Sequence, residues 1–360
     1  MHRDIDIYSS FRQSKFLVQS QMTDGKDLYA KISKATGQNL HVVVIGESSN
    51  RDHWSLYGYE RETTPYAKKW FSECNYCSYS NNAWAADKYT LFALDYALTN
   101  KSQYHSQTQN GIVSIIDVLN KAGFHTVWIS NQQYVGAENN GYNQIGQRAK
   151  EALFVEKKQF SFADDRPIET VLLKPLEDVI SKNQLKKNVI VFIHLMGSHA
   201  PYRYRYTDDF NFWEGGLNPN SLNAYDNSIL FTDMIINKIK EICKNADSFL
   251  YFSDHGELPG TGRDHLHIDM FKVPILAEFK KPTERQMRFL KNMKNNVPFT
   301  TDGIFDTLVG IYGVETNYYQ RSLDLSDEQY SFKRVEDLLV NSGRNKIIDG
   351  FIIEIKNDSK

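Results

Sequence analysis

Residues 41–47 read HVVVIGE, a β-branched run that ends in a glycine and a glutamate. A short run of this kind is typical of a strand buried on both faces of a parallel sheet. Similar runs follow at 126–130 (TVWIS), 188–193 (NVIVFI) and 249–252 (FLYF). The sequence therefore predicts several parallel strands, each leading into a loop at the same edge of the sheet.

Helical periodicity fills the gaps between these strands. Residues 111–122 (GIVSIIDVLNKA) precede Gly123, a natural C-cap, and residues 228–243 (SILFTDMIINKIKEIC) form a longer amphipathic pattern. Strands that alternate with helices indicate an α/β fold, with a mostly parallel central sheet flanked by helices on both faces.

Composition narrows the class of protein. The 360 residues include 42 basic and 44 acidic side chains, a formal charge of −2, which argues against a dedicated nucleic-acid binder. Hydrophobic residues make up 41%, enough for a substantial core. No run reaches the roughly 18 apolar residues that span a bilayer, and the polar opening lacks the apolar segment of a signal peptide.

Three polar sites follow the predicted strands directly. Glu47 follows the first, His194 follows the third, and Asp254 with His255 follows the fourth. Ligands of open α/β sheets bind at the carboxyl ends of strands, and zinc accepts carboxylate oxygen and imidazole nitrogen. An isolated Asp-His pair is more often a hydrogen-bonded turn, but together these residues predict a metal site.

Histidines gather in two of these loops. His194 and His199 flank a small-residue turn, and His265 and His267 lie shortly after His255. A single histidine is usually a satisfied core or surface residue. Five on two strand-end loops favour a role in binding, because imidazole is a common metal ligand.

Thr90 is the candidate nucleophile. Residues 89–98 (YTLFALDYAL) predict a helix with Thr90 near its N-terminus. The positive end of a helix dipole and its free N–H groups favour an alkoxide and a bound phosphate. The alternative is that Thr90 only caps the helix.

The chain has three cysteines, Cys74, Cys77 and Cys243. Cys74 and Cys77 form a lone C-x-x-C without the second pair that a four-thiolate zinc site needs. We expect either two half-buried thiols or a local disulfide.

These residues lie within motifs that resemble bacterial phosphoethanolamine transferases of the alkaline phosphatase and sulfatase superfamily. The resemblance covers about residues 40–315. Its blocks, in family order, are 43–59 (VVIGESSNRDHWSLYGY), 61–65 (RETTP), 128–132 (WISNQ), 194–202 (HLMGSHAPY), 225–233 (YDNSILFTD), 253–257 (SDHGE) and 301–313 (TDGIFDTLVGIYG).

The resemblance implies an alkaline-phosphatase-like fold and a zinc site, holding one ion or two, formed by Glu47, Thr90, Asp254 and His255. It further implies that Thr90 attacks phosphatidylethanolamine and carries phosphoethanolamine to an acceptor.

The resemblance also assigns the remaining histidines. His194 and His199 match the two histidines of the family's H-x-M-G-S-H block, which implies that both lie among the substrate-binding residues. His199 and a later histidine would hold a second metal or the phosphoryl group and act in acid–base catalysis. His267 is our choice for the later position and His265 the reserve.

Family members carry transmembrane helices before this domain. We therefore expect residues 1–38 to be a lead-in of helix and linker from a missing membrane anchor, 39–330 to be the catalytic domain, and 331–360 to pack on it as a C-terminal extension. The resemblance places the chain, as a monomer, at the periplasmic face of the bacterial inner membrane, which it would contact through that anchor.

The lipid-A-modifying branch of the family is rich in disulfides, so with only three cysteines the resemblance implies lipopolysaccharide core or another glycan as the acceptor. The alternatives are a phosphoglycerol transferase or phosphomonoesterase on the same scaffold, or a metal-bound glycan-binding module without catalysis. Sulfatase activity is disfavoured, because no cysteine has the Pro and Arg that follow the sulfatase nucleophile.

Overall fold

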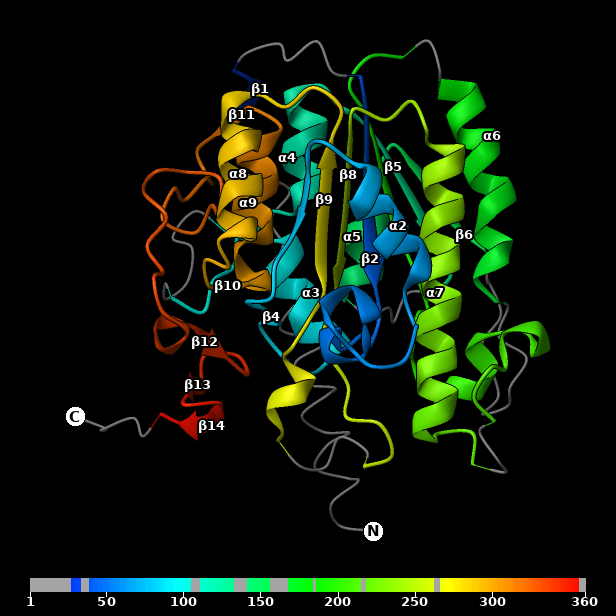
Figure 1. Cartoon of the computed structure of the whole chain (residues 1–360). Coiled ribbons are helices and arrows are strands. Elements are labelled where there is room, and N and C mark those ends of the chain that lie inside the picture. The colour runs from blue at the N-terminus through cyan, green and yellow to red at the C-terminus, as the bar shows by residue number, and fades with distance from the viewer. Residues whose placement is uncertain are drawn as a thin grey trace.

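The computed structural model describes residues 27–33, 39–104, 111–132, 141–155, 168–183, 186–214, 218–261 and 266–355. A seven-stranded sheet with the order β3-β9-β8-β2-β7-β5-β6 forms its centre (Figure 1). The strands from β8 to β6 are parallel, whereas β9 and β3 pair antiparallel at one edge. The strands are β2 (Leu40–Gly46), β3 (Cys77–Tyr79), β5 (His125–Ser130), β6 (Glu151–Phe154), β7 (Val189–His194), β8 (Ser248–Ser253) and β9 (Ile275–Phe279).

The predicted fold class is confirmed. Each of the four apolar runs forms a strand, and these four lie next to one another in the sheet. The outer strands β3, β6 and β9 were not predicted. Strands β3 and β6 lie at the two edges of the sheet, where strands lack the continuous apolar run of buried ones, and the short run of β9 (ILAEF) is interrupted by a glutamate.

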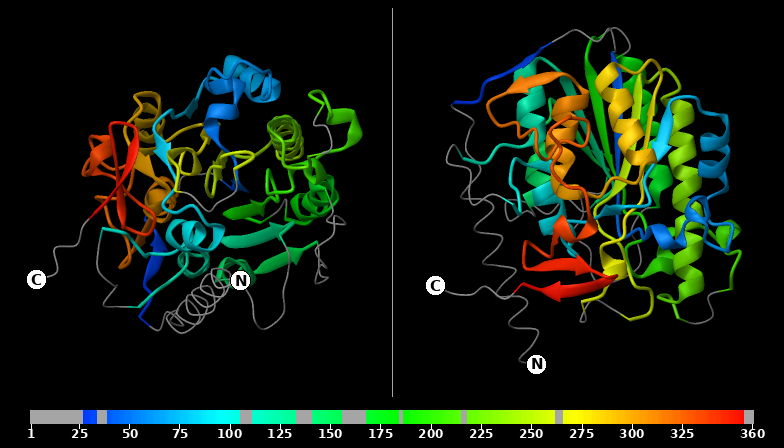
Figure 2. Two further views of the ribbon diagram at one scale, coloured as in Figure 1. Left: turned by 90° about the horizontal axis from the view of Figure 1, so that it is seen from below. Right: turned by 60° about the vertical axis from the view of Figure 1, so that its left-hand side comes forward.

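Helices cover both faces of the sheet (Figures 1 and 2). One layer packs against an apolar cluster that contains side chains from α2 (Pro65–Glu73), α6 (Leu173–Asn183) and α7 (Leu222–Ile242). The opposite layer contains α3 (Thr90–Leu98), α4 (Ile115–Ala122), α5 (Gly141–Gln147), α8 (Glu284–Lys294) and α9 (Ile304–Ile311).

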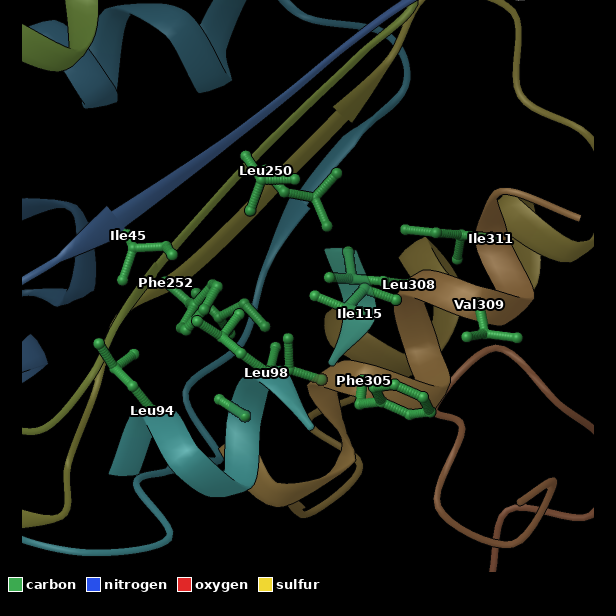
Figure 3. Close-up of a cluster of buried hydrophobic side chains, with 14 of the residues drawn as sticks. Ile45, Leu94, Leu98, Ile115, Leu250, Phe252, Phe305, Leu308, Val309 and Ile311 are labelled. Atoms are coloured by element: carbon green, nitrogen blue, oxygen red, sulfur yellow. The ribbon is translucent and has the colours of Figure 1, made fainter. Parts of the chain in front are cut away.

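Strand β2 shows why the sheet is buried on both sides. Successive side chains of a strand point to opposite faces, so Val43 and Ile45 enter one cluster while Val42 and Val44 enter the other. Figure 3 shows the first cluster, in which side chains of α3, α4 and α9 pack toward those of β2 and β8. These contacts hold the strand ends, and the loops after them, in fixed positions.

Two helices begin at different residues from those predicted. Helix α4 starts at Ile115, because Ser114 and Asp117 form a capping box, and it ends at Gly123 in the left-handed conformation, as expected. Helix α7 starts at Leu222, six residues before the apolar pattern, because Ser221 accepts the N–H of Ala224 as its N-cap.

Three small sheets and eight 3₁₀ helices complete the described part. Residues 1–26 and 34–38 of the expected lead-in lie outside the described residues, but β1 (Ala30–Ile32) pairs antiparallel with β11 (Val314–Thr316). Strand β4 (Ala83–Trp84) pairs with β10 (Phe299–Thr300). The 3₁₀ helices are η1 (Arg51–His53), η2 (Ser55–Tyr57), η3 (Glu169–Leu172), η4 (Tyr202–Arg205), η5 (Asp208–Phe210), η6 (Ile268–Met270), η7 (Thr301–Gly303) and η8 (Val335–Asp337).

The expected C-terminal extension forms a sheet of its own. Strands β12 (Leu339–Val340), β13 (Asn345–Ile348) and β14 (Phe351–Glu354) are antiparallel neighbours. Leu338, Val340 and Ile347 from this region join the core cluster on the α3 side of the central sheet.

Cys74 and Cys77 form a disulfide, one of the two expected states, and Cys243 is a buried free thiol. Within the described ranges, no helix combines the length and the apolar character needed to cross a membrane.

Candidate active site

The carboxyl ends of β2 and β8 bring together three of the expected ligands. Gly46 pairs with Ser253, so the next residues, Glu47 and Asp254, leave the sheet side by side. His255 follows directly, and all three side chains are buried. One donor atom from each lies within 4.8 Å of the others, so a single cation could contact all three.

The distances between these donor atoms are short. His255 Nε2 lies 3.4 Å from Glu47 Oε1 and 3.4 Å from Asp254 Oδ2. A contact at the other ring nitrogen fixes the orientation of the imidazole, because His255 Nδ1 lies 2.7 Å from the carbonyl oxygen of Gly256. A hydrogen bond of this kind leaves Nε2 available to a ligand.

Thr90 joins the group from a separate element, α3. It is the first residue of α3, and its Oγ1 lies 3.2 and 3.1 Å from the two carboxylate oxygens of Glu47. The same oxygen lies 3.2 Å from His255 Nε2. The structure thus brings together Glu47, Thr90, Asp254 and His255, which lie in three separate parts of the sequence.

The electrostatics of this group favour a bound cation. Burial and the neighbouring Glu47 carboxylate raise the pKa of Asp254 above its usual range, since two buried negative charges repel. A negative Thr90 oxygen would face the same repulsion. Two carboxylates, an imidazole and a hydroxyl form a donor set that zinc accepts, so the residues present fit this ion.

Two neighbours that carried no predicted role hold Glu47 in place. Ser48 donates its hydroxyl to Glu47 Oε1 at 2.8 Å and its N–H to Asp254 Oδ1 at 3.0 Å. Its φ of 56° lies in the left-handed region, which serine rarely adopts and which occurs more often at functional sites. Gln132 donates to Glu47 Oε2 at 3.3 Å. Gln132 lies in one of the family-like blocks, which is the signal that could have pointed to it.

The loop after β7 packs directly against Glu47. Gly197 has φ +49°, and a Cβ at this position would lie 2.6 Å from the carbonyl oxygen of Glu47. Ser198 donates its N–H to that same oxygen at 3.0 Å. Glu169, on η3, is buried and also fixes this loop. Its carboxylate accepts the N–H groups of Met196 at 2.5 Å and Gly197 at 2.8 Å. Sequence reasoning missed Glu169, which lies far from any motif.

The two histidines of this loop occupy different environments. His194 is fully buried beside Trp128, and burial lowers its pKa to about 4, so the ring is neutral at pH 7. His199 is half-buried, with Nδ1 2.6 Å from the carbonyl oxygen of Ala200. His199 therefore has the more open position of the pair.

The later histidines lie apart from the four-residue group. His267 caps η6 by accepting the N–H of Asp269, and its side chain is 46% exposed. It is not among the clustered donor atoms of the described residues. His265 lies outside the described residues.

A contact from the C-terminal extension supports the segment before Thr90. Asp87 is buried, accepts the N–H of Tyr89 at 3.1 Å, and receives a 2.6 Å hydrogen bond from Ser342 Oγ. Ser342 also donates its N–H to the carbonyl oxygen of Ala86. No sequence signal links residues so far apart, so only the fold could reveal this contact.

Comparison with known proteins supports the family resemblance. Residues 39–328 match the family model described as Sulfatase. Phosphoethanolamine transferase EptC of Escherichia coli O18:K1:H7 is 32% identical over 257 residues, which cover 65% of this chain and 44% of that protein. Phosphoethanolamine transferase EptA of Salmonella typhimurium is 26% identical over 319 residues, covering 81% of this chain and 56% of that protein. The resemblance predicted from the motifs is confirmed, and the chain spans about half the length of these relatives.

The fold is also similar to that of solved structures. The C-terminal periplasmic domain of E. coli EptC in complex with Zn has a TM-score of 0.75 at 23% identity, with 90% of this chain and 94% of that chain covered. The soluble domain of lipooligosaccharide phosphoethanolamine transferase A from Neisseria meningitidis has a TM-score of 0.66 at 18% identity, covering 85% and 96%. At these identities the likeness shows a shared fold.

Proposed function

This chain belongs to the sulfatase family, and we propose that it transfers phosphoethanolamine from phosphatidylethanolamine to a cell-envelope glycan or lipopolysaccharide acceptor. The proposal rests on one observation: Thr90 Oγ1 lies within 3.2 Å of both Glu47 and His255, at the first turn of α3. The Thr90 hydroxyl thus lies beside a buried donor set that suits zinc, and it also lies at the positive end of a helix.

The relatives support the type of group transferred. EptC and EptA, which are 32% and 26% identical to this chain over the matched regions, are named phosphoethanolamine transferases. The matched region covers about half of those proteins, so the donor, the acceptor and the periplasmic location at the inner membrane remain part of our proposal.

Glu47, Thr90, Asp254 and His255 are the residues that we propose hold the zinc ion. When bound, zinc would make the Thr90 hydroxyl more acidic and polarise the phosphoryl oxygens of the donor. The helix N-terminus would add N–H groups that favour negative charge on phosphate.

The proposed first displacement occurs at phosphorus. Thr90 Oγ1 gives up its proton to solvent and bonds to phosphorus, while the bond from phosphorus to the diacylglycerol oxygen breaks. Diacylglycerol leaves with a proton, for which half-buried His199 is the proposed donor. Phosphoethanolamine then stays on Thr90 as a phosphothreonine diester.

The second displacement restores the enzyme. An acceptor hydroxyl or phosphate oxygen bonds to phosphorus, the bond between Thr90 Oγ1 and phosphorus breaks, and Thr90 regains a proton from solvent. His199 would take up any proton that the acceptor loses. His267, whose side chain is 46% exposed, is our candidate for contact with the bound substrate.

Intact-mass measurement tests this function directly. The zinc-loaded chain, incubated with phosphatidylethanolamine, should gain the mass of one phosphoethanolamine group, located on Thr90 by peptide sequencing. Thr90→Ala should bind zinc, keep its fold and gain no mass. An adduct from phosphatidylglycerol instead would favour the phosphoglycerol alternative, and zinc binding without any adduct would favour the non-catalytic module.

A further inference from the structure

We propose that the sheet β12–β14 is a membrane-contacting surface, which turns the end of the folded molecule that contains Thr90 toward a phospholipid bilayer. This inference rests on the proposed function, because it assigns a role in reaching the lipid donor. The surface, called the outer face below, consists of Lys346, Ile348, Phe351 and Ile353.

Strand register puts these four side chains on one face. Strands β13 and β14 pair Ile348 with Phe351 and Lys346 with Ile353, and residues two apart in a strand share a face. Asp349 (φ 50°) and Gly350 (φ 80°) form the two-residue turn between them, with the positive φ values of a type I′ hairpin. A tight turn of this kind fixes which residues point outward.

The two faces of the hairpin differ sharply in burial. Ile347 is 2% exposed and packs in the core, with Ile352 against it. On the outer face Phe351 is 69% exposed, Ile353 45% and Ile348 38%. Three large apolar side chains side by side on one short hairpin are unusual on a protein surface that remains in water.

The chemistry of the outer face suits a phospholipid surface. Its one charged member is Lys346, and it carries no acidic side chain; Asp349 lies in the turn. Apolar side chains can enter the boundary between headgroups and acyl chains, while a lysine remains beside the lipid phosphates.

The position of the sheet connects it to the nucleophile. Ser342, in the turn between β12 and β13, hydrogen-bonds Asp87, which leads into α3 and Thr90. From this turn, β13 leads to the hairpin tip at Asp349 and Gly350, and β14 returns beside it. In Figure 1, β2 runs from the upper to the lower end of the molecule, and β12, β13 and β14 lie at that lower end.

Other exposed apolar side chains lie at the same end. Leu266 directly precedes His267, and Leu222 is the first residue of α7. Phe212 lies next to Trp213, whose backbone hydrogen-bonds Asn227 in the N-terminal half of α7. The right-hand view of Figure 2 likewise shows the C-terminal strands next to the segment with η6. Half of the large apolar side chains that are exposed in the described residues therefore lie at this end: Phe212, Leu222, Leu266, Ile348, Phe351 and Ile353.

Vesicle sedimentation tests the inference. The intact chain is mixed with vesicles of phosphatidylethanolamine and phosphatidylcholine, and the bound fraction is measured against lipid concentration. The double variant Phe351→Ser with Ile353→Ser should lower the partition coefficient at least about tenfold, since both side chains lose their apolar transfer energy. A control double variant, Tyr76→Ser with Met287→Ser, removes two apolar side chains that are each 44% exposed and lie elsewhere, and it should leave partition unchanged.

Activity distinguishes this inference from the proposed function. With a short-chain, water-soluble phosphatidylethanolamine, the Phe351/Ile353 variant should acquire the Thr90 adduct at the wild-type rate, whereas with vesicle lipid it should be slower by about the loss in partition. Absence of an adduct in every protein, with the partition difference intact, would overturn the function alone. If both variants and the wild type partition equally, the membrane contact is overturned. It is also overturned if the wild type self-associates and the Phe351/Ile353 change abolishes that self-association.

Discussion

Ser342 Oγ donates a 2.6 Å hydrogen bond to Asp87 Oδ2, across 255 residues of sequence. Asp87 Oδ1 accepts the N–H of Tyr89, and Tyr89 directly precedes Thr90. The C-terminal extension therefore helps to position the first turn of α3. This contact makes the C-terminal extension part of the support of the proposed nucleophile.

Ser342→Ala should slow phosphoethanolamine transfer without weakening substrate binding. Loss of one hydrogen bond, worth about 1 kcal/mol, predicts a fall in kcat of roughly fivefold with KM nearly unchanged. Steady-state kinetics at several donor concentrations would separate the two constants. The control is Ser331→Ala, an exposed serine earlier in the same region. A change confined to KM, or an equal effect of the control, would argue against positioning.

Glu47→Gln should weaken metal binding and yet spare the metal-free fold. Removing one ligand predicts at least about a tenfold loss of zinc affinity. In the metal-free protein, the same change removes the repulsion between Glu47 and Asp254, so the variant should unfold at the wild-type temperature or above. Elemental analysis and thermal unfolding with and without chelator measure both effects. Exposed Glu60→Gln is the control, and equal zinc content in wild type and Glu47→Gln would contradict the site.

Chelation itself should destabilise the wild-type chain. A cation that binds only the folded state raises the unfolding temperature, because its binding free energy adds to stability. Removing zinc should therefore lower Tm, and restoring it should recover the original value. Calorimetry with chelator, then with excess zinc, measures the shift. An unchanged Tm after proven metal removal would contradict a metal at this buried position.

Gly197→Ala should disturb the site through the backbone of Glu47. The added Cβ would lie 2.6 Å from the carbonyl oxygen of Glu47, and φ is +49°. The matched control is Gly58→Ala, where φ is +99° but no atom lies within 4 Å of the new Cβ. The control should cost about 1 kcal/mol of unfolding free energy from the conformation alone. Gly197→Ala should cost clearly more and also reduce zinc binding; equal costs would rule out the close contact.

His41→Gln should flatten the acid dependence of stability. His41 is buried at the start of β2, beside Ser248 Oγ at 2.8 Å, and burial lowers its pKa to about 4. Between about pH 6.5 and 4 the unfolded chain binds a proton that the folded chain excludes, so folding stability falls as pH falls. Glutamine does not titrate there.

Urea unfolding of both proteins at pH 7 and pH 4.5 measures the difference. Wild type should lose about 2 kcal/mol more than His41→Gln over this range. Parallel losses would show that the imidazole takes up its proton in the folded chain at its ordinary pKa.

The predicted parts of the fold came from local patterns. A strand buried on both faces needs a continuous apolar run, so residues 41–46 and three similar runs revealed the centre of the sheet. Edge strands such as β3 and β14 face water or another layer on one side, and their short mixed sequences carry no such signal. Helix α7 began earlier than predicted because a capping residue, Ser221, set its start.

The sequence by itself determined the α/β architecture, the family and the residue types needed for a zinc-assisted nucleophile, because strand periodicity and motif order are properties of neighbouring residues. Only the tertiary structure decided that Thr90 Oγ1 lies within 3.2 Å of both Glu47 and His255, and that Ser342 supports the segment before Thr90. It also separated buried His194 from exposed His267. Such distances depend on how the sheet and helices pack, and packing joins residues that the chain keeps far apart.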